Sequence, residues 1–271
     1  MRVDRTLAYL VLSLFTAAVL IPFLLIALTS LKTPDELGAG LLTLPEAPQW
    51  GNYLRAWTEG NLRRYFLNSL IVIVPVVVVT PALAAMCAYA LALLPLPGRR
   101  TLFAVLLLGL VVPYEGLIIP LYYGLRSVGL LNTYLAMILP LIALSLPFGT
   151  YLLWATFKSL PDALIDAAVL DGAGRMTVFR HVLLPLARPT FGVLTIFLFI
   201  WNWNEFFIPL VMVSDDALRT LPVGIAFFQG RYTTDIPLLA AGATIVAAPL
   251  VVVYLAFQRQ FISGLVKGAV D

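Results

Sequence analysis

The sequence has little charge for its length. Only 11% of its 271 residues are charged, whereas 61% are hydrophobic. A soluble globule of this size would need a larger share of polar residues to cover its surface, so the composition excludes a soluble domain and indicates a membrane protein. The net charge of +3 is modest, and no cluster of lysine and arginine alternates with aromatic residues. A nucleic-acid-binding surface is therefore excluded as well.

Residues and motifs that carry chemistry are equally scarce. The single cysteine, Cys87, lies in an apolar run, where it is predicted to pack as a small hydrophobic residue and can form no internal disulfide. The single histidine, His181, cannot form a zinc site alone and is expected on the surface of a polar loop. The sequence contains no G-x-x-x-x-G-K-[ST], H-E-x-x-H or G-x-S-x-G motif. We therefore expect no cofactor in this chain, no ATP hydrolysis by it and no catalytic activity.

Apolar segments long enough to cross a bilayer dominate the chain. At about 1.5 Å of rise per helical residue, a span needs about 20 apolar residues. Six segments meet this requirement, at about 7–31, 68–94, 101–125, 134–157, 189–213 and 238–257. The first is longer than the apolar core of a signal peptide and is predicted to be a retained helix. The predicted fold class is all-α, with residues 1–271 forming a single, polytopic transmembrane domain.

The distribution of basic residues predicts the orientation of these six spans. An even number of spans places both termini on one side, and lysine and arginine are enriched in cytoplasmic loops. Ten basic residues fall on the side of the termini, namely Arg2, Arg5, Arg99, Arg100, Lys158, Arg175, Arg180, Arg188, Arg259 and Lys267. Seven fall in the longer loops of the other side, namely Lys32, Arg55, Arg63, Arg64, Arg126, Arg219 and Arg231. This difference favours cytoplasmic termini, although Arg63 and Arg64 beside the second span run against it.

The longest polar interruption in the C-terminal half is PDALIDAAVLDGAGRMTVFRHVLLP, residues 161–185. Pro161 suits the first position of a helix, and Asp162 places an anion at the positive end of the helix dipole. Gly172 and Gly174 can adopt positive φ and are predicted to end this helix. An amphipathic segment then returns the chain to the membrane. The residues alone allow two interpretations, a docking helix for another protein and an ordinary connector.

The order of small and acidic residues in this segment resembles a known motif. Asp166, Ala167 and Ala168 precede Gly172 and an apolar helix that ends in Leu-Pro, as in the EAA loop of ABC importer membrane subunits, which usually has glutamate at the first position. In that family the loop forms the coupling helix, which lies in a cleft of the cytoplasmic ATPase. The resemblance places the loop at 158–188 and implies a docking surface made of Asp166, Ala167, Ala168, Leu170, Asp171, Gly172 and Ala173.

Polar groups within the predicted spans are candidates for a solute pathway. Glu115, in VVPYEGLIIP, must have a partner, water or a proton at membrane depth. On a helix it would share a stripe with Tyr122, and Pro113, Gly116 and Pro120 would loosen the backbone around it. We expect Glu115 and Tyr122 to line a cavity. The alternative is a buried structural carboxylate.

The segment WNWNEFF in the fifth span is a second candidate. Trp201, Asn202 and Glu205 would lie on one face of a helix, and aromatic rings beside amide and carboxylate groups suit sugars. The alternative is an aromatic belt at the outer interface combined with interhelical hydrogen bonds.

Four segments are similar to carbohydrate ABC importer permeases of the maltose type. They are SLKTPDEL near residue 30, RRYFLNSLIV from Arg63, the WNxF-like WNWNEFF, and TLPVG at residues 220–224. The resemblance covers nearly the whole chain and implies the type I ABC importer permease fold. It also implies a second homologous permease subunit, two ATPase subunits that bind ATP and Mg, and an external solute-binding protein. The expected location is the inner, or cell, membrane of a bacterium or archaeon.

The resemblance predicts a non-catalytic subunit that forms half of a translocation path and receives motion from the ATPase through the loop at 158–188. One rival is an ATP-independent secondary transporter or channel for a small polar solute, in which charges near the midplane would couple transport to an ion. A membrane-embedded enzyme is the other rival, with Glu115 or Glu205 as acid or base.

Overall fold

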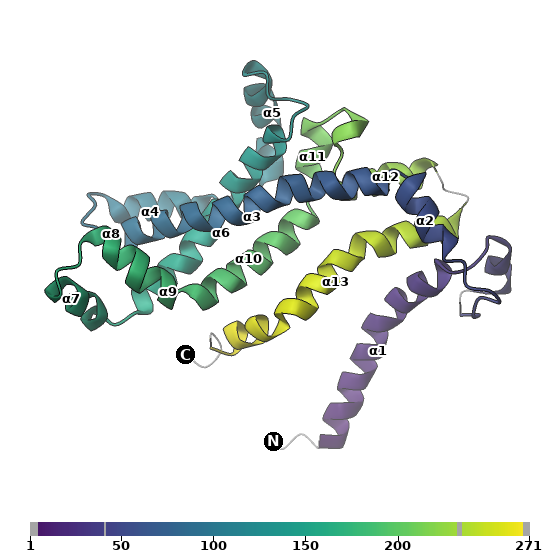
Figure 1. Cartoon of the computed structure of the whole chain (residues 1–271), viewed down its shortest axis with the longest axis horizontal. Helices are drawn as coiled ribbons and strands as arrows, with labels where there is room; N and C mark the ends of the chain where they lie inside the picture. Colours follow the sequence, from purple (N-terminus) through teal and green to yellow (C-terminus); the bar gives the residue numbers. More distant parts are fainter. Residues whose placement is uncertain (1–4, 41, 232–234, 268–271) are drawn as a thin grey trace. The chain divides into compact units, whose positions relative to one another are not determined.

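The fold is entirely helical in the part of the chain that the structure describes. The structure is a computed structural model that describes residues 5–40, 42–231 and 235–267, and it contains no strand in these ranges (Figure 1). Arg2, which entered the charge comparison, lies outside them. The all-α prediction is confirmed.

The chain divides into two compact units. Unit 1 comprises Met1–Phe66 and Leu221–Pro249, and unit 2 comprises Leu67–Thr220 and Leu250–Asp271. The long helices α3 and α13 each contribute residues to both units. The single transmembrane domain expected from the sequence stays a prediction.

Four single helices are long and apolar enough to span a membrane. They are α1 (Arg5–Thr29), α3 (Leu62–Leu93), α6 (Leu135–Ser159) and the Ile236–Gln258 part of α13 (Ile236–Lys267). A fifth span is available if Arg175–Leu186 and α10 (Arg188–Trp203), which meet at an angle of 71°, cross together as one bent element. The protein is therefore polytopic.

The third predicted span is broken. Its residues form α4 (Arg99–Leu108), the short 3-10 helix η2 (Tyr114–Leu117) and α5 (Ile118–Ser127). Pro113, which has no N–H to donate, adopts an extended conformation with φ −65° and ψ 116° between α4 and η2. Residues 101–125 therefore do not form one continuous helix. A sixth crossing is not contradicted, because α4, η2 and α5 together contain the same apolar segment.

Two segments that lie between predicted spans contain helices. Residues 32–66 include η1 (Asp35–Ala39) and α2 (Gly51–Thr58), and residues 214–237 include α12 (Leu221–Arg231). A side chain at Gly224, the glycine of TLPVG, would collide with the ring of Tyr65. The absence of a side chain at this position allows α12 to pack against the first turn of α3.

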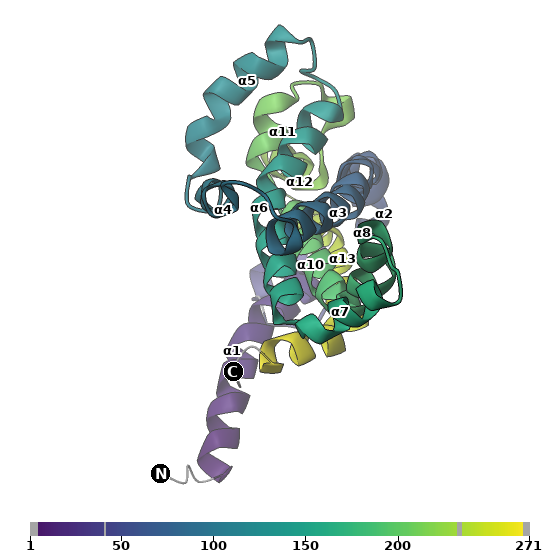
Figure 2. The ribbon, with the colours of Figure 1, turned by 90° about the vertical axis from the view of Figure 1, so that its left-hand side faces the viewer.

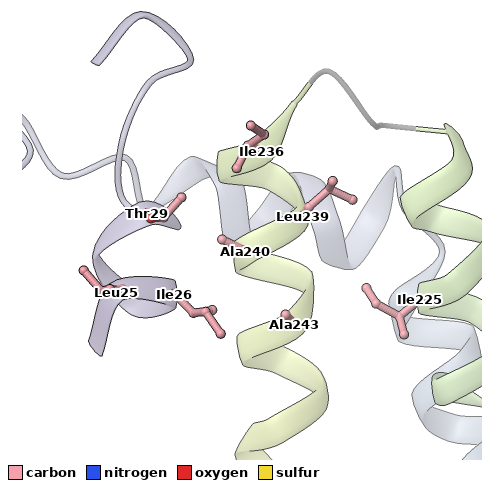
Figure 3. A pocket seen from close by; sticks show the side chains of 8 residues that line it. All are labelled: Leu25, Ile26, Thr29, Ile225, Ile236, Leu239, Ala240 and Ala243. Carbon is pink, nitrogen blue, oxygen red and sulfur yellow. The ribbon is translucent and has the colours of Figure 1, made fainter. Parts of the chain in front are cut away.

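Unit 1 also contains an apolar cavity of about 420 Å³ between α1, α12 and α13 (Figure 3). Seven of its eight lining side chains are aliphatic, and the eighth is the buried Thr29. Sugar hydroxyls that enter such a cavity would lose hydrogen bonds to water without replacement. The cavity is therefore not a candidate sugar site.

A polar network orders the segment that follows α1. The buried Lys32 donates hydrogen bonds from Nζ to the carbonyl of Gly40 at 2.9 Å and to the hydroxyl of Thr43 at 3.0 Å. The Glu36 carboxylate accepts from the backbone N–H of Thr33 at 2.7 Å and of Glu46 at 2.8 Å. These bonds close the segment on itself, so its shape depends on the charge of Glu36.

We expect this segment to loosen at low pH. The backbone N–H groups of Thr33 and Glu46 hold the pKa of Glu36 below its ordinary value, and the Thr33 hydroxyl and the Lys32 charge act in the same direction. A carboxyl whose pKa is lowered by folding stabilises the fold fully above its unfolded pKa of about 4.3, and this stabilisation is lost as the pH falls from there through the lowered pKa. Hydrogen exchange of residues 33–46, corrected for intrinsic rates, should therefore accelerate on acidification through this range.

The control for this prediction is Glu36→Gln. An amide has one acceptor oxygen and cannot ionise, so exchange in this variant should already be fast at pH 7 and should show no further acceleration that depends on residue 36. Equal protection of the wild type at pH 7 and at a pH below 3 would contradict the role of Glu36.

Unit 2 contains two buried apolar clusters. The first joins α3, α6 and α10 to the segment after α7 (Asp162–Leu170), and its buried members are Ala84, Ala85, Ala88, Ala92, Leu153, Phe157, Val178, Phe179, Leu183, Ala187, Leu194 and Leu198. The second joins α3, α5, α6 and α11 (Phe207–Met212), and its buried members are Val72, Val76, Ile118, Ala136, Met137, Ile138, Leu141, Ile208, Met212 and Val213. Within this unit, α7 and α8 (Arg175–Thr177) lie at one end and α5 and α11 toward the other (Figures 1 and 2).

Candidate functional site

The predicted docking helix is present as α7 (Asp162–Leu170). Asp162 lies in its first turn, where a negative charge is favourable, and Pro161 precedes it in an extended conformation. Gly172 follows with φ +85°, its N–H donates to the carbonyl of Val169 at 3.0 Å, and the N–H of Ala173 donates to the carbonyl of Ala168 at 2.9 Å. This pair of bonds is a Schellman motif, so Gly172 ends the helix as predicted.

Gly174 does not share this role. Its φ is −73° and its ψ is 165°, an extended conformation, and it precedes α8 (Arg175–Thr177). The prediction of a positive φ at Gly174 is therefore wrong. One left-handed residue already reverses the chain and satisfies the last carbonyls of α7, so a second is not needed.

The helix α7 and the turn that follows it have one face against the first cluster of unit 2 and one face in solvent. Ile165, Ala168 and Ala173 pack against the first cluster, whereas Asp166, Ala167, Leu170, Asp171 and Gly172 are exposed. The predicted docking residues thus divide into a contact face and a supporting face. Two of them, Ala168 and Ala173, belong to the supporting face.

Leu170 stands out on the exposed face because 88% of its surface is accessible. The neighbouring carboxylates Asp166 and Asp171 form no ion pair among the described residues. Leu170 therefore protrudes beside these two carboxylates, where its side chain is accessible to another protein.

A bent connection links α7 to the spanning helix α10. It consists of α8, the π-helical segment η3 (Val178–Leu183) and α9 (Leu184–Leu186), and it meets α10 at 71°. Val178, Phe179 and Leu183 are buried, whereas His181 is exposed, as expected for a surface residue. One side of the connection therefore packs in the first cluster, and the other side is exposed to solvent.

At the other end of unit 2, two interrupted spans meet. The fifth predicted span breaks between α10 and α11, and the Glu205 carboxylate at this break accepts hydrogen bonds from the N–H groups of Phe207 at 2.9 Å and Ile208 at 3.0 Å. Its other oxygen accepts a hydrogen bond from the hydroxyl of Tyr114, in η2, at 3.3 Å. Glu205 therefore caps α11 and joins the break in one span to the break in another.

Glu115 and Tyr122 lie on different elements. Glu115 is exposed in η2 and makes no hydrogen bond or ion pair within the described ranges, whereas Tyr122 lies in α5 and packs against the second cluster. The single helix on which they were expected to share a stripe is absent, because η2 interrupts it. Their role as pathway residues stays a prediction.

Trp201, Asn202 and Glu205 do not form the predicted common face, because α10 ends at Trp203. Trp201 is 49% exposed and its ring lies 4.7 Å from that of Phe148. Asn202 is buried and donates a hydrogen bond to the carbonyl of Leu198 at 2.7 Å. Trp201 also packs against the ring of Phe197, with 5.4 Å between centroids, so it is half exposed between two aromatic neighbours, whereas Asn202 is part of the packing.

Two tyrosines that were not among the predicted site residues each make a hydrogen bond between elements of unit 2 that are distant in the sequence. Tyr114 binds Glu205, and Tyr89 of α3 donates a hydrogen bond to the carbonyl of Arg175 at 3.0 Å. The sequence offered a signal for Tyr114, because it lies between prolines in an apolar segment and its hydroxyl can donate to a carboxylate. Tyr89 had no such signal, since its acceptor is a backbone carbonyl that is distant in sequence. No group of three or more potential metal ligands occurs among the described residues.

These features define a class of protein. Several helices that are long and apolar enough to cross a membrane, a bent helix pair next to an exposed polar helix, and two interrupted apolar segments are the arrangement of a membrane transport subunit.

Comparisons with known proteins assign the family. The sequence profile of the family described as "Binding-protein-dependent transport system inner membrane component" matches residues 1–267. NgcG of Streptomyces coelicolor, a diacetylchitobiose uptake system permease protein, is 36% identical over 97% of this chain and 87% of its own length. SugB of Mycobacterium tuberculosis, a trehalose transport system permease protein, is 36% identical over 93% of this chain and 92% of its own.

A solved structure has the same fold. In the crystal structure of a bacterial ABC transporter involved in the import of the acidic polysaccharide alginate, one chain matches with a TM-score of 0.81 at 22% identity, over 96% of this chain and 98% of that one. The fold is therefore that of an ABC importer permease, as predicted. The chain belongs to the family of binding-protein-dependent transport system inner membrane components. It is a non-catalytic membrane subunit of an ABC importer.

Proposed function

We propose that this chain is one of two membrane subunits of an ATP-driven importer of small carbohydrates. The observation that carries the proposal is the exposed face of α7, where Leu170 protrudes between Asp166 and Asp171 at the end of a bent span. The named solutes of the relatives that are 36% identical, diacetylchitobiose and trehalose, support a sugar as the cargo.

The energy for import comes from separate chains in this proposal. Two ATPase subunits, which bind ATP and Mg, dock on the α7 helix of this subunit and on the corresponding helix of a second, homologous permease subunit. An external solute-binding protein delivers the sugar, which agrees with the family's description. Closure of the ATPases displaces α7, and ATP and the loaded binding protein together favour the outward-facing state because they bind it better.

In this proposal the position of the docking helix determines how the protein is oriented in the membrane. An ATPase that uses cytoplasmic ATP must meet α7 in the cytoplasm, so both termini lie on that side. The excess of basic residues on the side of α7, ten against seven, supports the same orientation.

The sugar path follows the two broken spans. Trp201 offers an aromatic face for the C–H surface of a sugar ring, and Glu115 offers an unpaired carboxylate for its hydroxyls. Glu205 shapes the break between α10 and α11, while Tyr122 and Asn202 support the wall from within the packing. Discontinuous helices of transporters commonly form solute sites in this way.

Co-purification and uptake test the proposal together. The chain, expressed with its partner genes and purified by a tag on its N-terminus, should bring down a second permease and an ATPase with a phosphate-binding loop. Vesicles containing this complex should accumulate a labelled disaccharide only with ATP and the binding protein. Purification without any ATPase, or accumulation that needs only an ion gradient, would refute the proposal.

A further inference from the structure

Two contacts join α3 to the chain directly after the docking helix. The hydroxyl of Tyr89 donates a hydrogen bond to the carbonyl of Arg175 at 3.0 Å. The ring of Tyr89 also packs against that of Phe179, with 5.0 Å between ring centroids. Both acceptor and ring belong to the bent connection between α7 and α10.

Helix α3 packs closely against the same connection beside these contacts, while the hydrogen bond of Tyr89 is itself exposed. Ala84, Ala88 and Ala92, spaced by one helical turn on α3, are buried in the same cluster as Val178 and Leu183. Small side chains let neighbouring backbones approach closely.

The same cluster extends to the neighbouring helices of unit 2. A Cβ atom at Gly149 of α6 would lie 3.0 Å from the Cβ of Ala84 and 3.4 Å from Leu194 of α10. The hydroxyls of Thr156 in α6 and Thr190 in α10 lie 2.9 Å apart. The helices α3, α6 and α10 therefore form one tightly packed block at the end of unit 2 that carries the docking helix.

We propose that Tyr89 is a positioning residue that makes α3 follow the docking helix during the transport cycle. This inference rests on the proposed function, because it requires that α7 is displaced by an ATPase. The chain connects α7 covalently to α6, through Leu160 and Pro161, and to α10, through the 71° bend, but not to α3. The two contacts of Tyr89 pass the same displacement directly to α3 as well.

The two contacts of Tyr89 act by destabilising conformations in which α7 and α3 have not moved together. A contact that persists in both the inward-facing and the outward-facing conformation shifts no equilibrium between them. It does raise the free energy of slipped states, in which the docking helix has moved and α3 has not. One hydrogen bond between neutral groups changes the population of such states by roughly two- to tenfold. Slipped states consume ATP without moving sugar.

The test is Tyr89→Phe in the complete, reconstituted complex. Phenylalanine keeps the ring against Phe179 and removes only the hydroxyl, so the variant should assemble as the wild type does. We expect the ATP hydrolysed without import of sugar to rise by roughly two- to tenfold, which raises the ratio of ATP hydrolysed to sugar imported. Tyr151→Phe is the matched control, since Tyr151 of α6 is exposed and no hydrogen bond from its hydroxyl occurs within the described part of the chain. Its ratio should equal that of the wild type.

Two results would overturn the role of Tyr89. One is an unchanged ratio of ATP to sugar in Tyr89→Phe. The other is a parallel fall of ATPase activity and uptake in proportion to the amount of assembled complex, which would show a purely structural contribution. In both cases the wild-type complex would still import sugar with ATP, so the proposed function would stand. If the wild-type chain recovers no ATPase, both proposals fail.

Discussion

Leu170→Asp should release the chain from its ATPase. Leu170 is 88% exposed on α7, and burial of a leucine in a partner's groove contributes about 1.5–3 kcal/mol. The substitution removes this contribution and places a charge where water is excluded, at a further cost. At 1.4 kcal/mol for each tenfold change, association should weaken by at least about 10- to 100-fold. The amount of ATPase that co-purifies and the ATP-driven uptake of sugar should both fall accordingly.

Two variants separate docking from general damage. Leu170→Met keeps an apolar side chain of similar volume and should retain both ATPase and uptake. Leu44→Asp changes a leucine of similar exposure, 76%, in the segment predicted to lie on the opposite side of the membrane. It should leave the amount of bound ATPase unchanged. Normal ATPase recovery and uptake in Leu170→Asp would show that this face of α7 is not the docking surface.

Glu205→Ala is expected to have the second largest effect, through stability. The substitution leaves the N–H groups of Phe207 and Ile208 and the hydroxyl of Tyr114 without their acceptor. Loss of a helix cap costs about 0.5–2 kcal/mol, and an unsatisfied buried donor costs about 1–3 kcal/mol. We expect a total of about 2–3 kcal/mol, which lowers the melting temperature of the purified protein by about 4–10 °C. Uptake should fall as well, because the junction of the two broken spans loosens.

Comparison with Glu205→Gln and Glu115→Ala tests this explanation. Glutamine retains one acceptor oxygen, so Glu205→Gln should recover part of the lost stability. Glu115 has no described hydrogen-bond partner, so Glu115→Ala should leave the melting temperature unchanged and should alter uptake if the residue contacts sugar. A melting temperature of Glu205→Ala equal to that of the wild type would contradict the capping role.

The docking loop was predictable in detail because its signals are local. Pro161 and Asp162 mark the start of α7, and Gly172 marks its end through a backbone conformation that favours glycine. Which residues face outward was not predictable in the same way. The burial of Ala168 and Ala173 depends on the first cluster of unit 2, whose members come from helices distant in the sequence.

The interruptions of the spans were harder to predict. Hydropathy reports how apolar a segment is and not whether its backbone is continuous, so 101–125 and 189–213 each read as one helix. Pro113 signalled a weakened backbone, whereas the break after Trp203 is set by Glu205, which accepts hydrogen bonds from the next helix. Trp201, Asn202 and Glu205 therefore do not share the helical face that their spacing predicted, because α10 ends before Glu205.

The most direct test of the account is uptake by proteoliposomes with and without the ATPase. The purified permease pair alone should not accumulate sugar under any ion gradient, and addition of the ATPase, ATP with Mg and the loaded binding protein should start accumulation. The same addition to vesicles containing Leu170→Asp should have little effect. Accumulation by this polypeptide without a nucleotide-binding partner would contradict the claim that its energy enters through α7.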